Sequence, residues 1–266
     1  MRIVSLAPSN TEILFALGAG SDIVGRTAFC DYPPEALSVR KVGDWVEPDI
    51  ERIRALEPDV ILTSTVVQEK LAAKLRKEGL PVEHLSPTNL EGVFRSIYKL
   101  GQITGRLGEA DALVQGMLLS FSELEAGAAA VSRPPRLYIE EWHAPPFVSG
   151  NWVPELAEIA GADYSLSEAG RLSREVSEEE VRRYDPELII LSICGVRLGP
   201  EVVLSREGWK GVSAIRAREV HVMDDSLLNR PGPRLVEGCR QLCSLVTSFS
   251  RRTAAGRPSS RAATRL

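Results

Sequence analysis

Short apolar runs alternate along most of the chain with stretches whose apolar positions have helical spacing. The β-branched runs at 60–63 and 188–192 are typical of buried strands, whereas residues 68–78 and 233–249 have helical periodicity. The same criteria predict strands at 2–6, 82–85, 137–140 and 220–223, and helices at 12–17, 48–56, 154–160 and 177–184. Strands that alternate with helices of this length indicate parallel sheets with both faces covered.

Two segments have the spacing of a capping box, in which a Ser or Thr and a Glu three residues later begin a helix. These are Ser9 with Glu12 and Thr88 with Glu91. Helical periodicity continues from Thr88 to about residue 130, and the prolines at 134–135 end it. We therefore predict one long helix over residues 88–131.

An internal repeat is the strongest organisational signal. Residues 51–61 and 179–189 correspond at a constant offset of 128, and a looser match pairs 12–18 with 155–161. The predicted fold is α/β, with two Rossmann-like lobes of mostly parallel sheet joined by one long helix, and a ligand cleft between the lobes. We expect an N-terminal α/β lobe at 1–87, the connecting helix at 88–131, a C-terminal α/β lobe at 132–250 and a disordered basic tail at 251–266.

Composition and charge exclude several classes of protein. The 266 residues include 32 Lys and Arg against 36 Asp and Glu, a formal net charge of −4, which disfavours nucleic acid as a partner. Four cysteines are too few for a disulfide framework, and Cys239 with Cys243 fits the apolar face of a helix. No apolar run approaches the length needed to cross a bilayer, and the first residues lack the pattern of a secretory signal. As written, the sequence predicts a cytoplasmic protein.

Candidate catalytic residues are few. The sequence lacks nucleophile-elbow, phosphate-loop, dinucleotide-binding and zinc-protease motifs, so we expect a protein that is not an enzyme. Of the histidines, His84 and His221 fall beside predicted strands, whereas His143 lies in a proline-stiffened loop beyond a strand. Ligands of α/β sheets gather at such ends, so His143 is a candidate ligand contact. It lacks the neighbouring ligands of a stable metal site, and no metal is predicted.

Aromatic side chains on loops indicate a binding site more clearly. Rigid rings on loops of both lobes suit a large, flat, partly apolar ligand. They are Phe29, Tyr32, Trp45, Trp142, Phe147 and Trp152. A polar segment after the last strand adds Asp225, Ser226, Asn229 and Arg230 at the same predicted edge.

Glu51 and Glu179 occupy matching positions early in the repeated helices. Acidic residues in a first helical turn complement the helix dipole, which is one explanation for both. Equivalent acidic side chains on two lobes would also suit docking onto basic sockets of a two-fold partner.

Several segments together resemble the cobalamin-binding members of the iron-siderophore and cobalamin substrate-binding proteins of ABC importers. The likeness extends over about residues 2–248. It rests on 5–12 (SLAPSNTE), 31–34 (DYPP), Trp45, 50–53 (IERI), 58–61 (PDVI), 145–150 (PPFVSG) and 230–234 (RPGPR).

The resemblance implies roles for individual residues. It implies that Phe29 lies against the corrin, that Trp45 and Phe147 line the pocket, and that residues 226–230 contact the ligand. It also implies that Glu51 and Glu179 engage arginines of the transporter's membrane subunits. Two positions depart from the family pattern: Ser173 replaces a pocket tryptophan, for which Trp142 can compensate, and Ser226 replaces an acid, with Asp225 adjacent.

Our hypothesis is a monomeric substrate-binding protein that captures cobalamin or a related corrinoid in the cleft and delivers it to an ABC transporter. The cobalamin is its transported ligand rather than a cofactor, and the resemblance implies an extracytoplasmic location. A ferric siderophore or haem is the alternative within the family, although an anionic siderophore should require several cleft cations and only Arg26 and Arg230 are suitably placed. A cytoplasmic corrinoid-handling protein or enzyme is the alternative from another class, and would need an acid and base such as His143 with Glu140 or Glu141.

Overall fold

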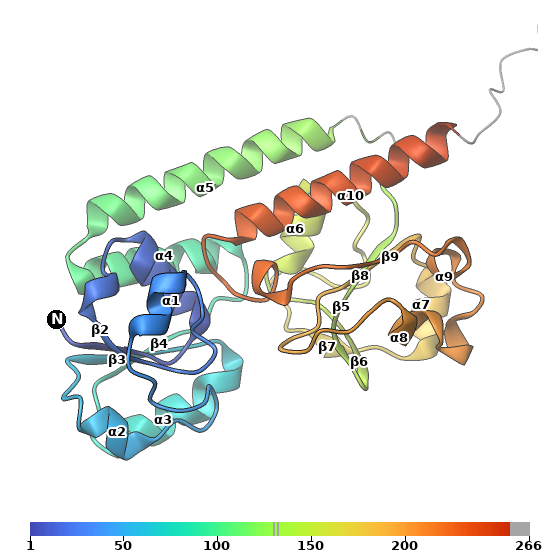
Figure 1. The fold of residues 1–266 in the computed structure, drawn as a ribbon. Helices are drawn as coiled ribbons and strands as arrows, with labels where there is room; N and C mark the ends of the chain where they lie inside the picture. The colour runs from blue at the N-terminus through green and yellow to red at the C-terminus, as the bar shows by residue number, and fades with distance from the viewer. Residues whose placement is uncertain (130, 132, 256–266) are drawn as a thin grey trace, which may run out of the picture.

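The computed structural model describes residues 1–129, 131 and 133–255. Two α/β lobes lie side by side, and two long helices, α5 (Leu107–Ala128) and α10 (Leu235–Ala255), run together along one side of both (Figure 1). This arrangement confirms the predicted fold class of two α/β lobes bridged by a helix.

The N-terminal lobe contains a parallel sheet with strand order β2-β1-β3-β4. Its strands are β1 (Ile3–Ser5), β2 (Ile23–Arg26), β3 (Val60–Ser64) and β4 (Val82–Leu85), and its helices are α1 (Pro8–Ala16), α2 (Ile50–Arg54) and α3 (Glu69–Lys77). Alternate strand residues enter different cores: Ile3 and Leu62 join the main core, whereas Val4 and Ile61 join a second cluster with α2 and α3. The sheet is therefore covered on both faces, as the pattern predicted.

The C-terminal lobe contains a mixed sheet with strand order β7-β6-β5-β8-β9. Strands β5, β8 and β9 are parallel, whereas β6 and β7 add an antiparallel edge that the sequence did not predict. Its strands are β5 (Leu137–His143), β6 (Pro146–Val148), β7 (Arg174–Glu175), β8 (Leu188–Leu191) and β9 (Val220–Val222), and its helices are α6 (Val153–Ile159), α7 (Glu178–Tyr184), α8 (Glu201–Leu204) and α9 (Ser213–Ala217). Short 3-10 turns lie at Gly20–Asp22, Pro34–Ser38, Val66–Gln68, Glu207–Trp209 and Asp225–Leu227.

The internal repeat corresponds to a repeated structure. Helix α2 leads into β3 in one lobe, and α7 leads into β8 in the other. The looser match corresponds to α1 and α6, and the glycines that follow them, Gly18 and Gly161, both have positive φ of 72° and 76°. Glycine adopts this conformation without the strain that a Cβ would cause.

The prediction of a single helix over 88–131 was wrong in one respect. The segment forms two helices, α4 (Leu90–Thr104) and α5, which pack against each other, so only α5 bridges the lobes. Gly105 ends α4 in the left-handed conformation, and the Arg106 N–H donates to the Gly101 carbonyl at 2.7 Å. This is the glycine-terminated helix end that reverses the chain direction.

Both predicted capping boxes were also wrong. Helix α1 begins at Pro8, so Ser9 and Glu12 lie within it, and Asn89 rather than Thr88 caps α4 by accepting from the Gly92 N–H at 2.8 Å. A capping box does begin α7, between Ser177 and Glu180. The prediction of a disordered tail was wrong for residues 251–255, which continue α10; the rest of that tail, 256–266, lies outside the described residues.

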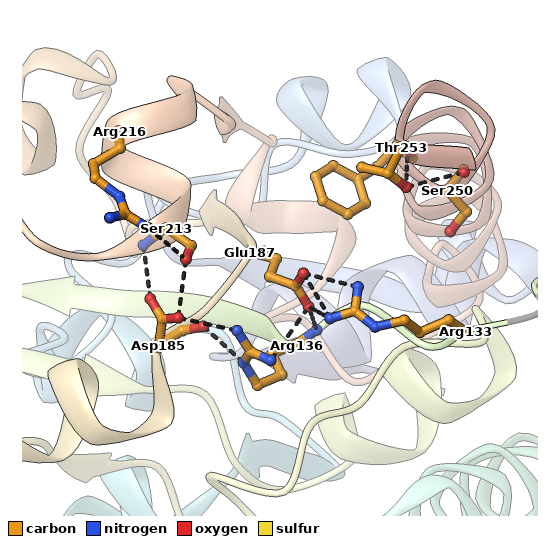
Figure 2. Close-up of polar contacts among 9 residues, drawn as sticks. Arg133, Arg136, Asp185, Glu187, Ser213, Arg216, Ser250 and Thr253 are labelled. Atoms are coloured by element: carbon orange, nitrogen blue, oxygen red, sulfur yellow. Dashed lines mark hydrogen bonds and ion pairs between the residues drawn. The ribbon is translucent and has the colours of Figure 1, made fainter. Parts of the chain in front are cut away.

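A polar network closes the end of the C-terminal sheet where β5 and β8 begin (Figure 2). Both terminal nitrogens of the Arg133 guanidinium donate to Glu187 Oε1 at 2.8 and 2.9 Å, and the Arg136 side chain donates to Asp185. Asp185 also accepts from the Ser213 backbone N–H at 2.7 Å. The network holds the chain that enters β5 against the turn before β8 and the start of α9.

Candidate functional site

A cavity of about 390 Å³ lies between the lobes, within the usual size range of small-molecule sites. Both lobes contribute walls, and most of the lining side chains are apolar. The lining residues are Trp45, Thr65, Val66, Val67, Ser86, Pro87 and Thr88 from the N-terminal side, and Glu141, Trp142, Phe147, Asn151, Trp152, Val153, Leu172, Ser173, Cys194, Leu228 and Asn229 from the C-terminal side.

Gln68 positions the N-terminal wall. This fully buried side chain donates to the carbonyls of Leu6 and Trp45, at 2.9 and 2.7 Å, and accepts from the Ser64 N–H at 2.8 Å. It therefore ties the Trp45 loop to the ends of β1 and β3. Next to it, Thr65 has a φ of 62°, an unfavourable conformation for a β-branched residue. Such strain is common at ligand-binding sites.

The β5–β6 hairpin and α6 position the aromatic rings of the C-terminal wall. The prediction that Trp142 and Phe147 lie on loops was wrong, because they belong to β5 and β6. They are directly opposite each other across the hairpin, so both rings lie on the same face. Trp152, at the start of α6, is almost fully buried, and its indole N–H donates to the Leu228 carbonyl at 2.7 Å. The ring is thereby fixed, whereas Trp142 remains exposed to the cleft.

A hydrogen-bonded polar cluster lies beside these rings on the C-terminal wall. Ser173 donates to Glu141 Oε2 at 2.5 Å, and Asn229 Nδ2 donates to Cys194 Sγ at 3.1 Å. Burial raises the pKa of Glu141, partly opposed by the hydrogen bond from Ser173. Burial and the nearby carboxylates of Glu141 and Asp225 raise the pKa of Cys194 to about 12. The thiol is therefore protonated and a poor nucleophile.

The structure brings five of the predicted ligand-binding residues together in the cavity wall: Trp45, Trp142, Phe147, Trp152 and Asn229. Whether they bind the ligand stays a prediction. The other six lie outside this wall. They are Phe29, Tyr32, His143, Asp225, Ser226 and Arg230.

The residues outside the cavity wall are either exposed or hydrogen-bonded within the protein. Phe29 and Tyr32 are exposed. The prediction that His143 lies in a loop beyond a strand was wrong: it is the last residue of β5 and pairs with Pro146 of β6, and its backbone carbonyl accepts from Arg206 at 3.0 Å. Ser226 is buried and donates to Asp224 at 2.6 Å, and Asp225 accepts from the Gly195 N–H at 3.2 Å. The first of these contacts lies at the 3-10 turn Asp225–Leu227, and the second ties this turn to the loop after β8, so both side chains are engaged within the protein.

Arg230 is engaged in a charged cluster between α1 and the segment before α10. It donates to Glu12 at 3.0 Å and to Asp31 at 2.6 Å, while Arg234 donates to both Glu12 oxygens and stacks on the ring of Tyr32. Burial lowers the pKa of Arg230, but the bonds with Asp31 and Glu12 outweigh burial and raise it overall. The arginine thus has partners within the protein, although the sequence indicated a ligand contact.

The two glutamates expected to dock on a permease are exposed. The Glu51 and Glu179 side chains are 87% and 71% exposed, in the first turns of α2 and α7. Each lies near an arginine of its own helix: Glu51 is 3.7 Å from Arg54, and Glu179 is 2.6 Å from Arg183. Exposed pairs of this kind contribute little to stability, so both carboxylates are free to exchange partners.

Sequence reasoning missed several lining residues. Thr65 follows β3, residues 86–88 follow β4, and Cys194 lies shortly after β8. The rule that ligands of α/β sheets gather beyond the carboxyl ends of strands could have found all of these. Ser173 was noted only as a departure from the family pattern, and its contact with Glu141 has no local signal in the sequence.

The described residues contain no cluster of three or more His, Cys, Asp or Glu side chains arranged to hold a metal ion. None of their helices combines the length and hydropathy required to cross a bilayer.

The sequence matches a known protein family over most of its length. A family model described as "Periplasmic binding protein" matches residues 3–227. The chain belongs to this family. It is therefore a substrate-binding protein of the ABC-importer type, and its family consists of extracytoplasmic proteins that bind ligands rather than catalyse reactions.

The chain is similar to several characterised and uncharacterised relatives over most of its length. It is 28% identical to an uncharacterised ABC transporter substrate-binding lipoprotein, YvrC, of Bacillus subtilis, over 92% of this chain and 79% of the relative. It is 27% identical to a vitamin B12-binding protein of Pectobacterium atrosepticum, over 93% of this chain and 89% of the relative.

Solved structures agree in fold. The periplasmic haem-binding protein RhuT of Roseiflexus matches with a TM-score of 0.80 and 23% identity, covering 94% of this chain and 98% of that one. The periplasmic vitamin B12-binding protein BtuF of Vibrio cholerae matches with a TM-score of 0.77 and 24% identity, covering 94% and 98%. Proteins named for different ligands thus share this architecture, and the fold alone does not choose between them.

Proposed function

We propose that this periplasmic binding protein captures cobalamin or a related corrinoid between its lobes and delivers it to an ABC importer. The observation that carries the proposal is the cavity wall: three aromatic rings, Trp45, Trp142 and Phe147, come from both lobes around a mostly apolar space. Rings of this kind provide stiff surface for a large, flat macrocycle. Two relatives named above, one of known sequence and one of known structure, are vitamin B12-binding proteins.

The polar lining favours a corrinoid over haem or a ferric siderophore. The cavity residues among the described part of the chain include no Lys, Arg, His, Tyr or Met. Haem carries two propionates, and its iron takes a ligand such as His, Tyr, Met or a Cys thiolate. Cys194 lies in the cavity, but its raised pKa disfavours the thiolate. An anionic siderophore would likewise lack charge-assisted partners in this lining.

The proposal places the protein outside the membrane, where it meets its ligand before docking. We assign docking to Glu51 and Glu179, which are exposed and equivalent in the two lobes. Two equivalent acidic side chains match the symmetry of a permease built from two copies of one subunit. Electrostatic pairs at such an exposed rim contribute to the rate and register of association.

The first experiment is calorimetric titration of the ligand-free protein with cyanocobalamin, with haem and a ferric hydroxamate as parallel ligands. We expect saturable binding of the cobalamin at micromolar affinity or better, about −8 kcal/mol or stronger. Trp45→Ala should weaken it by about tenfold, because a stacked ring contributes about 0.5–1.5 kcal/mol beyond its buried area. Tyr98→Ala, which removes a ring of α4 outside the cavity wall, is the matched control. Binding of haem or the hydroxamate without cobalamin would refute the ligand assignment.

The docking assignment has its own test. Glu51→Ala combined with Glu179→Ala should abolish association with the cognate permease and leave ligand affinity unchanged. The control is Glu91→Ala combined with Glu168→Ala, which removes two carboxylates of similar exposure elsewhere on the surface. Equal permease association of both double variants would contradict the assignment.

A further inference from the structure

The polar atoms of the cavity are divided between its two walls. On the N-terminal wall, Trp45 Nε1 and Thr65 Oγ1 are buried and have no hydrogen-bond partner among the described residues. An indole N–H can only donate, and a hydroxyl can donate. Buried polar atoms without partners are rare in folded proteins, so these two donors indicate a place where a ligand supplies an acceptor.

Acceptors dominate the opposite wall. Ser173 Oγ accepts from the Gly150 N–H at 3.0 Å, so its single proton is available for Glu141, to which it donates. Asn229 Nδ2 donates to the Ser192 carbonyl at 2.8 Å. This contact fixes the orientation of the side-chain amide, because in the flipped orientation the amide oxygen would face the carbonyl oxygen. Asn229 Oδ1 is left buried, with no partner in the described part of the chain.

The charge of Glu141 has no cationic partner in the cavity lining. Arg206 approaches the same strand, but it pairs with the buried Glu140 at 2.6 and 2.7 Å. Arg230 follows Asn229, but it pairs with Glu12 and Asp31. The wall that carries Glu141 is therefore an acceptor surface. Glu141 is its one charged group among the described lining residues, and the hydrogen bond that Ser173 donates stabilises the ionised form against burial.

We infer that the cavity recognises primary carboxamide groups of its ligand, and that Glu141 is the specificity residue that rejects carboxylates; the inference rests on the proposed corrinoid function. A carboxamide has both N–H donors and a carbonyl acceptor, so one such group, or two on the same macrocycle, can satisfy both walls. A carboxylate can satisfy only the N-terminal wall and is repelled by Glu141. A ligand that must hydrogen-bond a buried polar group is discriminated strongly from an analogue that cannot.

The test compares two ligands with the same macrocycle: a corrinoid with intact side-chain amides, and its derivative in which these amides are hydrolysed to carboxylates. The unmutated protein should bind the amide form more tightly by about a hundredfold, because hydrogen bonds to charged groups are stronger than those between neutral groups. Glu141→Gln removes the charge at constant size and should reduce this preference at least about tenfold, mainly by improving binding of the carboxylate form.

Two further variants complete the design. Glu158→Gln, an exposed carboxylate of α6 outside the lining, should keep the preference of the unmutated protein. Trp45→Phe keeps a ring but removes the indole donor, and should weaken both forms about equally, leaving the preference unchanged.

The outcomes distinguish a failure of the carboxamide inference from a failure of the proposed function. If the unmutated protein binds the amide corrinoid but Glu141→Gln has the same preference, the carboxamide inference is overturned and the proposed function stands. If the unmutated protein binds no corrinoid at all, both are overturned. If thermal unfolding shows that Glu141→Gln does not fold, Trp45→Phe still tests the inference. Loss of the preference for the amide form in Trp45→Phe, rather than equal weakening of both ligands, would contradict the placement of donors on one wall and acceptors on the other.

Discussion

Glu12, near the start of the chain, forms ion pairs with Arg230 and Arg234 near its other end. Replacing it by glutamine tests how much these buried ion pairs contribute to stability. Its side chain is 2% exposed and lies between two arginines that are 16% and 20% exposed. Arg230 donates to it at 3.0 Å, and Arg234 donates to it twice, at 2.9 and 2.6 Å. This contact joins α1 to the chain just before α10. Glu12→Gln keeps the shape of the side chain but removes its charge.

The expected loss of stability follows from these contacts. Removing one partner of a buried ion pair costs about 3–5 kcal/mol, because the remaining charge is buried without compensation. Arg230 keeps Asp31 at 2.6 Å, and glutamine keeps one acceptor oxygen, so the lower end of this range applies. We expect a loss of about 3 kcal/mol, which corresponds to a fall in Tm on the order of 10 °C for a chain of this size.

Urea unfolding followed by tryptophan fluorescence measures this loss directly. The control is Glu91→Gln, which removes an exposed i,i+4 pair with Arg95 and should cost about 0.3–0.5 kcal/mol. If Glu12→Gln were within 1 kcal/mol of this control, the cluster would not be a buried, compensated network, and the magnitude reasoning would be refuted.

Two further predictions concern titratable groups. Burial and two nearby carboxylates raise the pKa of Cys194 to about 12, so iodoacetamide at pH 8 should alkylate it about a thousandfold more slowly than an ordinary thiol. Glu141→Gln should speed this alkylation, which mass spectrometry measures. Equal alkylation rates in the variant and the unmutated protein would contradict the effect of the Glu141 carboxylate on Cys194. Burial raises the pKa of Glu219, but hydrogen bonds from Arg252 and His221 outweigh it and lower the pKa overall. Its contribution to stability is complete above the usual glutamate pKa of about 4.3 and is lost as the pH falls through the lower folded-state value, so Glu219→Gln should lower Tm at pH 7 and leave it unchanged near pH 2. An equal effect at both pH values would count against the ion pair.

The sequence predicted the lobes and most of their elements because the information is local. Runs such as residues 60–63 and 188–192 are β-branched and short, and the repeated helix–turn–strand units identify the two lobes. The break between α4 and α5 was also available locally, since Gly105 is the residue type that ends helices, but the continuing apolar periodicity hid it. Strand β7 has two exposed residues and no apolar pattern, so only its pairing with β6 defines it.

The site was less predictable because it depends on contacts between distant segments. Phe29 and Trp45 are both aromatic residues on loops of the same lobe, yet only Trp45 lines the cavity, where Gln68 holds its backbone. Glu12 has the spacing of a capping residue, but its partners lie 218 and 222 residues away. No local pattern distinguishes these cases, since burial and pairing are decided by the assembled lobes.

The contact between Glu12 and the arginines before α10 has a consequence for the order of folding. The N-terminal lobe is synthesised first, but its buried carboxylate has no counter-charge until residues 230–234 have left the ribosome. The contact closes a loop of more than two hundred residues, and contacts between segments so far apart in the sequence form slowly. The ion pairs that bury Glu12 can therefore form only once nearly the whole chain has been synthesised, long after the other residues of the N-terminal lobe.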